Sequence, residues 1–254
     1  VREFLDGPKP YIAMDWRDNP YIDRNAYEGS LNELDYIDQQ YQKYGNWHYK
    51  PQTGDLISRD EAESQYVTNI TTPYVYSLMG IDLAGKGRDM FAIVCYDYLN
   101  NGFEYIHDFN QTQSANPEGM LISFIRKHNQ NPAQPKTSVL VIEQEGGGSP
   151  EYARKYFQNI ILEAGYSIPV VLRTPSGSKY QRARPLVHGI KFGNVKLNSK
   201  GFYMDDFIDE MVQLDPLGKG RSPNLVDSCS LARNYLHDKV LGTKTRFKTG
   251  RRIG

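Results

Sequence analysis

Two glycines and a lysine in "GIDLAGKGRD" have the spacing of a phosphate-binding loop. Gly80, Gly85 and Lys86 fit the pattern G-x-x-x-x-G-K, in which backbone N–H groups and the lysine bind nucleotide phosphates. The next position should be Ser or Thr to reach a magnesium ion, but it is Gly87. Such a loop must also open a helix, whereas the following "RDMFAIVCYDYL" has the alternation and β-branched residues of a strand. The sequence therefore predicts a hairpin loop here and not a nucleotide site.

Three carboxylates stand where predicted core elements end or begin, and they indicate a different chemistry. Asp82 lies in the apolar run "YVYSLMGIDLA", Glu143 closes "VLVIE", and Asp227 opens the last long helix in "NLVDSCSLARNYL". A buried charge is costly unless it is paired or binds a metal ion. Carboxylate oxygens suit Mg²⁺ and Mn²⁺, and two such ions can stabilise the attacking and leaving oxygens of a phosphodiester. One such acid alone is more often a turn-capping residue, so the hypothesis depends on the recurrence of the pattern.

The pattern of apolar residues predicts the elements that would bring these acids together. From Pro73 onward, β-rich runs and amphipathic segments follow one another in the order β-β-β-α-β-α-β. The "NNG" tripeptide at 100–102 predicts a tight hairpin between the second and third strands. Two more helices are expected near 204–214 and 224–240, and one amphipathic helix is expected near 24–44.

This order, with acids on the first and fourth strands and on a late helix, resembles the ribonuclease H-like nuclease fold. The resemblance implies an α/β architecture with a central mixed β-sheet flanked by helices. It also implies that the first and fourth strands are neighbours in the sheet. Asp82 and Glu143 would then converge, and Asp227 would approach from the following helix.

Several stretches make the resemblance more specific, because they look like motifs of the large terminase subunit of tailed bacteriophages, a DNA-packaging motor and nuclease. The stretches are "GIDLAGKGRDMFAIV", "VLVIEQEGGGSPEYARKYF", "RPLVHGIKFGNVKLN" and "FIDEMVQLDPLGKGRSPNLVDSCSLA". The third resembles a hairpin element of the family and implies a β-hairpin added to the fold. Residues 18–50 resemble the segment between the ATPase and nuclease domains of the family.

The resemblance implies that the chain has two parts. Residues 1–67 would be a linker or tail of a packaging ATPase domain, forming an N-terminal helical extension, and 68–254 the ribonuclease H-like nuclease domain. The Walker motifs of that ATPase are absent from this sequence, so we expect a fragment without ATPase activity. The first part has 7 Lys/Arg against 13 Asp/Glu and the second 23 against 17, giving −6 and +6. This asymmetry is typical of a nucleic-acid-facing domain with an acidic extension.

Residue by residue, the resemblance implies that Asp82, Glu143 and Asp227 are the catalytic, metal-binding carboxylates. They would hold Mg²⁺ or Mn²⁺, with two ions expected. Asp89 would be an auxiliary acid that helps to hold the second ion or a water. Glu145 would point the same way as Glu143 in a continued strand, so it could share or replace that role. The choice between the two glutamates stays open.

Basic residues near these motifs could neutralise DNA phosphates without reading the base sequence. An ordinary solvated basic face is the alternative interpretation of the same residues. The candidates are Lys86, Arg88, Lys179, Arg182, Arg184, Lys191 and Lys196.

Composition argues against several other classes of protein. No apolar stretch approaches the roughly 20 residues that span a bilayer, and the N-terminus has no signal-peptide pattern. We therefore expect no membrane partner and no secretion. Cys95 and Cys229 lie in apolar segments without metal-ligand spacing, which predicts buried thiols in a reducing compartment.

The expected function is a metal-dependent endonuclease that cuts concatemeric double-stranded viral DNA with little sequence specificity, by two-metal-ion hydrolysis. The implied partners are DNA and, in a full-length protein, the packaging ATPase domain, the small terminase subunit and the portal. The implied location is the cytoplasm of the infected bacterial host. Two alternatives stay open: another ribonuclease H-like DNA enzyme, such as a junction resolvase or integrase-like enzyme, and a non-catalytic DNA- or portal-docking module.

Overall fold

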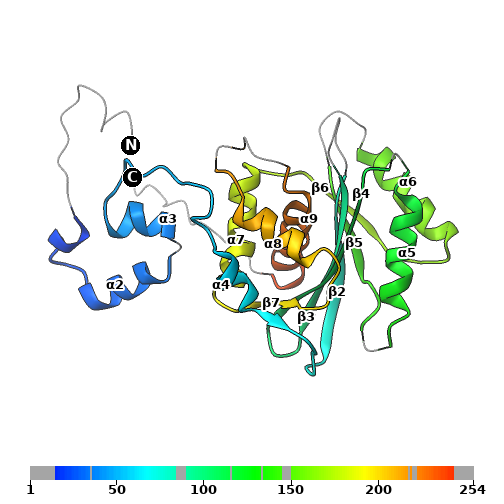
Figure 1. Ribbon diagram of the computed structural model, residues 1–254, viewed down its shortest axis with the longest axis horizontal. Coiled ribbons are helices and arrows are strands. Elements are labelled where there is room, and N and C mark those ends of the chain that lie inside the picture. The colour runs from blue at the N-terminus through cyan, green and yellow to red at the C-terminus, as the bar shows by residue number, and fades with distance from the viewer. Residues whose placement is uncertain are drawn as a thin grey trace, which may run out of the picture.

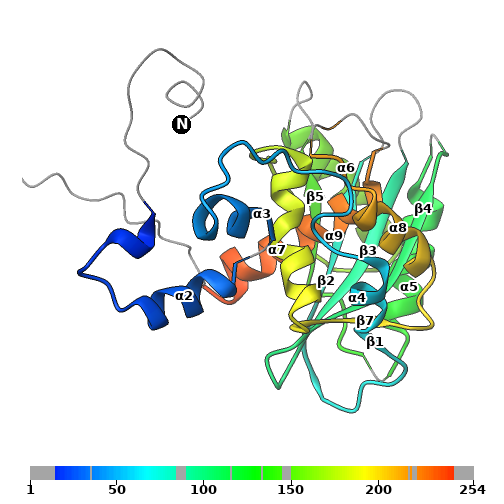
Figure 2. The ribbon, with the colours of Figure 1, turned by 60° about the vertical axis from the view of Figure 1, so that its left-hand side comes forward.

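A mixed β-sheet forms the centre of the fold (Figures 1 and 2). The computed structural model describes residues 15–34, 36–83, 90–114, 116–132, 134–144, 150–216, 218 and 222–242. Within these ranges seven strands form one sheet in the order β1-β7-β4-β3-β2-β5-β6. The strands are β1 (Tyr66–Val67), β2 (Tyr74–Asp82), β3 (Phe91–Leu99), β4 (Glu104–Thr112), β5 (Val139–Glu143), β6 (Val170–Arg173) and β7 (Val195–Asn198).

Helices cover both faces of the sheet and divide the core into two layers (Figure 1). The helices of the first face are α5 (Glu118–Asn129) and α6 (Pro150–Glu163). The second face packs against α7 (Lys179–Lys191), α8 (Met204–Val212) and α9 (Asn224–Tyr235), which continues as the π-helical turn η3 (Leu236–Val240). Alternate residues of β2 enter the two layers, since Met79 and Ile81 pack in the first and Leu78 in the second. None of the described helices has both the length and the apolar character to span a bilayer.

The strand pairing confirms the predicted order of elements from Pro73 onward. Strands β2, β3 and β4 form an antiparallel meander, and β5 then pairs with β2 in parallel. The "NNG" turn is the predicted hairpin, with Gly102 at φ 87° and its N–H donating to the Leu99 carbonyl at 3.0 Å. The two free cysteines, Cys95 and Cys229, are buried as predicted.

The β-hairpin expected over "RPLVHGIKFGNVKLN" is wrong. Residues up to Lys191 belong to helix α7, and the single strand β7 pairs in parallel with β1 and β4. Helix α7 starts at a capping box, in which Ser178 accepts from the Gln181 N–H while the Gln181 side chain accepts from the Ser178 N–H. Its buried residues recur at helical spacing, and this period outweighs the β-branched composition. They are Tyr180, Ala183, Leu186, Val187, Gly189 and Ile190.

The N-terminal extension is helical, but the single helix expected near 24–44 is interrupted. Helix α2 (Arg24–Asn32) ends where the Gln39 side chain donates hydrogen bonds to the carbonyls of Asn32 and Leu34, and α3 (Tyr36–Asp38) runs into the π-helical turn η2 (Gln39–Lys43). Ile37 is buried in the core layer of α7 and α9, so the extension packs on the rest of the chain. A short helix, α4 (Arg59–Glu63), and strand β1 continue this contact at the edge of the sheet.

Candidate active site

The first two predicted acids lie side by side at the C-terminal ends of neighbouring strands. Parallel pairing of Ile81 with Ile142 places Asp82 and Glu143 at the next position in register. Side chains alternate along a strand, and Ile81 and Ile142 pack in the layer of α5 and α6. Asp82 and Glu143 therefore both face α7 and α9, where they are 4% and 7% exposed.

The third acid, Asp227, reaches this position because α9 lies unusually close to the sheet. Asp227 is in the first turn of α9 and only 2% exposed. A Cβ atom on Gly80 would lie 2.2 Å from the Ser228 carbonyl oxygen and 2.9 Å from the Ala232 Cβ. Only glycine fits there, so the residue that begins the apparent phosphate-binding pattern has a packing role in β2.

Two glutamates that the sequence analysis did not single out hold the ends of α9. Pro223 offers no side-chain cap to the helix, and Glu210 of α8 serves instead: its Oε2 accepts from the N–H groups of Leu225 at 2.8 Å and Val226 at 3.1 Å. This satisfies two of the N–H groups that a helix start leaves without partners, directly before Asp227. Such a cap from another element leaves no local sequence signal.

Glu104 of β4 fixes the other end of α9. Its Oε1 accepts from Arg233 Nη2 at 3.1 Å and contacts His237 Nε2 at 3.0 Å, while its Oε2 accepts from Tyr96 Oη at 2.6 Å. Burial opposes the charge of Glu104, but the hydrogen bond from His237 and the charge of Arg233 outweigh it and hold the pKa of Glu104 below its usual value. The carboxylate is therefore ionised at neutral pH and anchors the helix.

Two cations from the first turns of α7 meet the acids. Lys179 Nζ lies 2.7 Å from Asp227 Oδ2, and it donates to Ser222 Oγ at 2.9 Å. Arg182 Nη2 lies 3.2 Å from Asp227 Oδ1 and 3.3 Å from Glu143 Oε1, so it bridges two of the acids. Burial disfavours the charged form of Lys179, but its contact with Asp227 and the charges of Asp82 and Glu143 raise the pKa of Lys179 overall.

The other predicted DNA-binding cations in the described ranges face the N-terminal extension. Arg184 pairs with Asp38. Lys191 pairs with Glu61 at 3.0 Å. Lys196 donates to Gln65 Oε1 at 2.7 Å. Helix α7 thus contacts the acids with its first turns and the extension further along. Lys86, Arg88, Asp89 and Glu145 lie outside the described residues.

The three carboxylates fit a hard divalent cation, although in this structure Lys179 and Arg182 pair with two of them. Asp82, Glu143 and Asp227 supply only carboxylate oxygens, the ligands that Mg²⁺ and Mn²⁺ prefer. In the part of the chain that the structure describes, no group of three or more Asp, Glu, His or Cys side chains is arranged to hold a metal ion as it stands. Arg182 and Lys179 form ion pairs with the Glu143 and Asp227 oxygens that such an ion would need.

A cleft of about 240 Å³ opens beside Glu143. Its walls come from the end of β6 and the loop after it, from α7 and from α9, and they include Arg173, Ser176, Arg182 and Asn234. Arg182 therefore borders both the acids and an open cleft.

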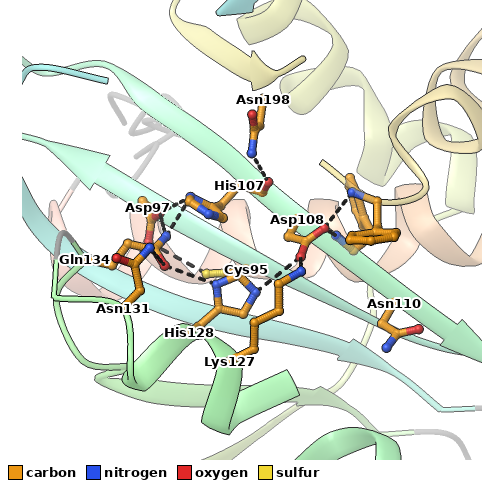
Figure 3. Close-up of polar contacts among 12 residues, drawn as sticks. Cys95, Asp97, His107, Asp108, Asn110, Lys127, His128, Asn131, Gln134 and Asn198 are labelled. Carbon is orange, nitrogen blue, oxygen red and sulfur yellow. Dashed lines mark hydrogen bonds and ion pairs between the residues drawn. The ribbon is translucent and has the colours of Figure 1, made fainter. Parts of the chain in front are cut away.

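A second buried polar cluster lies on the other face of the sheet, against α5 (Figure 3). Cys95 pairs with Asp108 and Tyr96 with Ile106, so His107 is an extra residue in β4, a β-bulge. Asp97 pairs with Ser77 and Asp82 with Ala92. Asp82 lies five positions after Ser77 in β2, which separates this cluster from Asp82 by about 16 Å along the strand.

A glutamine connects the members of this cluster. Gln134 Nε2 lies 2.6 Å from His107 Nδ1 and 3.3 Å from Asp97 Oδ2, while Gln134 Oε1 lies 3.2 Å from His128 Nδ1 (Figure 3). Burial raises the pKa of Asp97 to about 6 and lowers the pKa of His107 to about 4. Both groups are thereby held nearer their neutral forms, and the cluster ties α5 to the sheet.

Comparison with known proteins identifies the fold. No family model and no curated protein matches the sequence. Among solved structures, the large terminase of the thermophilic bacteriophage D6E in complex with ADP matches with a TM-score of 0.61 at 12% identity, over 94% of this chain and 58% of that one. The human cytomegalovirus terminase nuclease domain matches with a TM-score of 0.52 at 14% identity, over 72% of this chain and 94% of that one. A manganese-soaked, inhibitor-bound form of the same domain also gives 0.52, at 14% identity and over 73% and 96%.

These matches show that the chain has the fold of terminase nuclease domains, and they confirm the predicted ribonuclease H-like architecture. The chain spans 49–58% of the length of phage D6E terminase chains that it matches.

Proposed function

We propose that this chain is a metal-dependent DNA endonuclease, the nuclease part of a phage large terminase subunit with its preceding linker. The observation that supports the proposal most strongly is the gathering of Asp82, Glu143 and Asp227 on one face of a terminase-type sheet, beside two cations. We take the substrate to be concatemeric double-stranded viral DNA, cut with little sequence specificity in the cytoplasm of the bacterial host.

In this proposal the chain's own residues bind and orient the scissile phosphodiester. Asp82, Glu143 and Asp227 would hold Mg²⁺ or Mn²⁺, and we expect two ions. When bound, these ions supply Lewis-acid stabilisation of the phosphate oxygens and lower the pKa of the attacking water. Lys179 and Arg182 lie beside the acids and would bind phosphate oxygens, while Gly80, Glu210 and Glu104 keep Asp227 in place through α9.

The division of the chain at residue 67 is also proposed. Residues 1–67 would be a linker that follows a packaging ATPase domain, and the partners of the full-length protein would include the small terminase subunit and the portal. The last part of this linker, with Ile57, Ala62 and strand β1, shares the core and sheet of the nuclease part. We therefore expect the nuclease part to need residues from about 56 onward for full stability.

Plasmid cleavage tests the proposed activity. Supercoiled plasmid would be incubated with the protein in Mn²⁺, in Mg²⁺ and in EDTA, with Asp82→Asn as the inactive variant and the exposed Asp206→Asn as a matched control. We expect metal-dependent nicking, linearisation and fragmentation by the wild type and by Asp206→Asn, and none by Asp82→Asn. Equal cleavage by the folded Asp82→Asn protein would overturn the assignment.

The ion pairs at the acids favour one other candidate, a non-catalytic DNA- or portal-docking module. In that case Arg182 and Lys179 would be the permanent partners of acids that never bind metal. Calorimetric titration with Mn²⁺ separates the two candidates, because the docking module would show no heat of binding that depends on Asp227.

A further inference from the structure

The contact of Arg182 with the acids has the geometry of a weak, replaceable pair. A single atom, Nη2, serves both Asp227 and Glu143, at 3.2 and 3.3 Å. Strong charge-assisted hydrogen bonds are about 2.7–2.9 Å long, and arginine makes its best carboxylate pairs with two parallel N–H groups. The other terminal nitrogen, Nη1, donates instead to the Gly177 carbonyl at 3.3 Å. The arginine is therefore shared among three distant acceptors.

The acids nevertheless need a positive partner when no metal is bound. Asp227 and Glu143 have side chains that are only 1% and 10% exposed, and buried carboxylates are costly without a counter-charge. Lys179 neutralises one of them at 2.7 Å and is itself held by Ser222. Arg182 supplies the second positive charge from a side chain that is 15% exposed and borders the cleft beside Glu143.

We propose that Arg182 is a displaceable counter-ion: it pairs with Glu143 and Asp227 in the metal-free protein, and a divalent cation releases it toward a DNA phosphate in the adjacent cleft. The inference rests on the proposed function in taking these acids to bind a metal ion. It goes further by making metal binding and DNA binding mutually dependent, because the Arg182 side chain can pair either with the acids or with a DNA phosphate. Such coupling is reciprocal, so DNA would also raise the affinity for metal.

Metal binding without DNA gives the first test. Free Mn²⁺ would be measured by electron paramagnetic resonance during titration of wild type, Arg182→Gln, Arg182→Lys and Arg173→Gln. Arg173 borders the same cleft but pairs with Asp238, so its variant controls for the loss of one positive charge. We expect Arg182→Gln to bind Mn²⁺ about tenfold more tightly than wild type, Arg182→Lys to be intermediate, and Arg173→Gln to stay close to wild type.

The direction in which Arg182→Gln changes the Mn²⁺ affinity separates a displaceable counter-ion from a structural support. If Arg182 were only a structural support, its loss would leave the acids misplaced, and Mn²⁺ affinity would stay the same or fall in Arg182→Gln. That result, in protein whose thermal unfolding shows a native fold, overturns the proposal. If Arg182→Gln does not fold, a Mn²⁺ affinity of Arg182→Lys equal to or below that of wild type has the same meaning. Absence of Mn²⁺ binding in every variant would overturn the metal site itself, and with it the proposed nuclease.

DNA binding gives the second test. The Kd for a fluorescently labelled duplex would be measured by anisotropy in EDTA and in Ca²⁺, an ion that binds carboxylates. We expect Ca²⁺ to tighten DNA binding by the wild type and by Arg173→Gln, and to have little effect on Arg182→Gln. An equal gain from Ca²⁺ in wild type and Arg182→Gln would show that Arg182 does not couple the two ligands.

Discussion

Gly80 and Ser228 are in backbone contact, and a Cβ on the glycine would lie 2.2 Å from the serine carbonyl oxygen. This contact holds helix α9 against strand β2. Asp82 is the last residue of β2, and Asp227 directly precedes Ser228 in α9, so the contact also holds these two acids near each other. The distance between two of the three acids is thus fixed by a residue with no functional group. Glycine is required here by a neighbouring main chain and not by its own φ angle.

Replacing this glycine is expected to damage the site and the core together. Gly80→Ala has to push α9 away from β2, because the obstacle is a main-chain carbonyl that cannot rotate aside. We expect a loss of about 2 kcal/mol in the free energy of unfolding, together with loss of metal-dependent cleavage. Urea unfolding and the plasmid assay measure the two effects.

A second glycine provides the control for this variant. Gly119 lies in helix α5, and a Cβ there would meet nothing within 4 Å. Gly119→Ala should therefore be neutral or stabilising, since alanine favours the helix. A Gly80→Ala protein as stable and active as Gly119→Ala would contradict the packing role assigned to Gly80.

The cap that Glu210 provides predicts a separate effect on Asp227. In Glu210→Ala, the N–H groups of Leu225 and Val226 lose their acceptor, and the first turn of α9 frays. We expect a cost of about 1 kcal/mol in unfolding free energy and weaker Mn²⁺ binding. Glu210→Gln keeps one oxygen acceptor and should retain part of both, so a Gln variant as weak as the Ala variant would argue against capping.

The cluster around Asp97 and His107 predicts an unusual pH dependence of stability. The pKa of Asp97 is raised to about 6, so its contribution to the free energy of unfolding is present at low pH and is lost as pH rises toward 6. The pKa of His107 is lowered to about 4, so its contribution is present above about 6.5 and is lost as pH falls toward 4. The two contributions have opposite signs over the same range and should largely cancel in the wild type.

Single variants should reveal each contribution. In Asp97→Asn only the His107 contribution remains. The protein should then lose about 2 kcal/mol of stability between pH 7 and 4.5, relative to wild type. His107→Gln should show the reverse, a relative gain in stability on acidification. Urea unfolding of the three proteins across this range is the measurement, and parallel pH profiles would refute the opposed titrations.

The predicted DNA-binding cations should divide into two groups by function. Lys179 and Arg182 lie at the acids, and their replacement by Ala should weaken metal-supported DNA binding by about 1 kcal/mol each, or fivefold in Kd. Lys191 and Lys196 already have partners in the extension, Glu61 and Gln65, so their Ala variants should change DNA binding less. Anisotropy titrations of the four variants would show the division. Equal losses of DNA affinity in all four would indicate that the cations form a single basic face.

Much of the fold was predictable because the spacing of apolar residues indicates which segments form helices and strands. The alternation after Pro73 and the "NNG" turn predicted the β-meander, and the resemblance predicted that the first and fourth strands are neighbours, which sets Asp82 beside Glu143. The failure at α7 has a local cause. Val187 and Ile190 suit strands by composition, while the capping box at Ser178 and the spacing of buried residues favour a helix.

The parts of the site that escaped prediction depend on contacts between distant segments. Glu210 caps a helix that begins 14 residues later, and Glu104 anchors a residue that lies 129 positions away. The sequence gives neither glutamate a recognisable capping pattern, since an acceptor needs only to lie near a donor in the folded chain. The packing role of Gly80 was hidden for the same reason.

The ion pairs between α7 and the extension have a consequence for the counterions of this chain. Arg184 and Lys191 already face carboxylates, Asp38 and Glu61, so DNA that reaches this face exchanges one anion for another. Such an exchange releases fewer condensed cations from DNA than binding to free lysines does. The affinity for DNA should therefore fall less steeply with salt than the +6 balance of residues 68–254 implies. Replacing the two acids by their amides should make that salt dependence steeper.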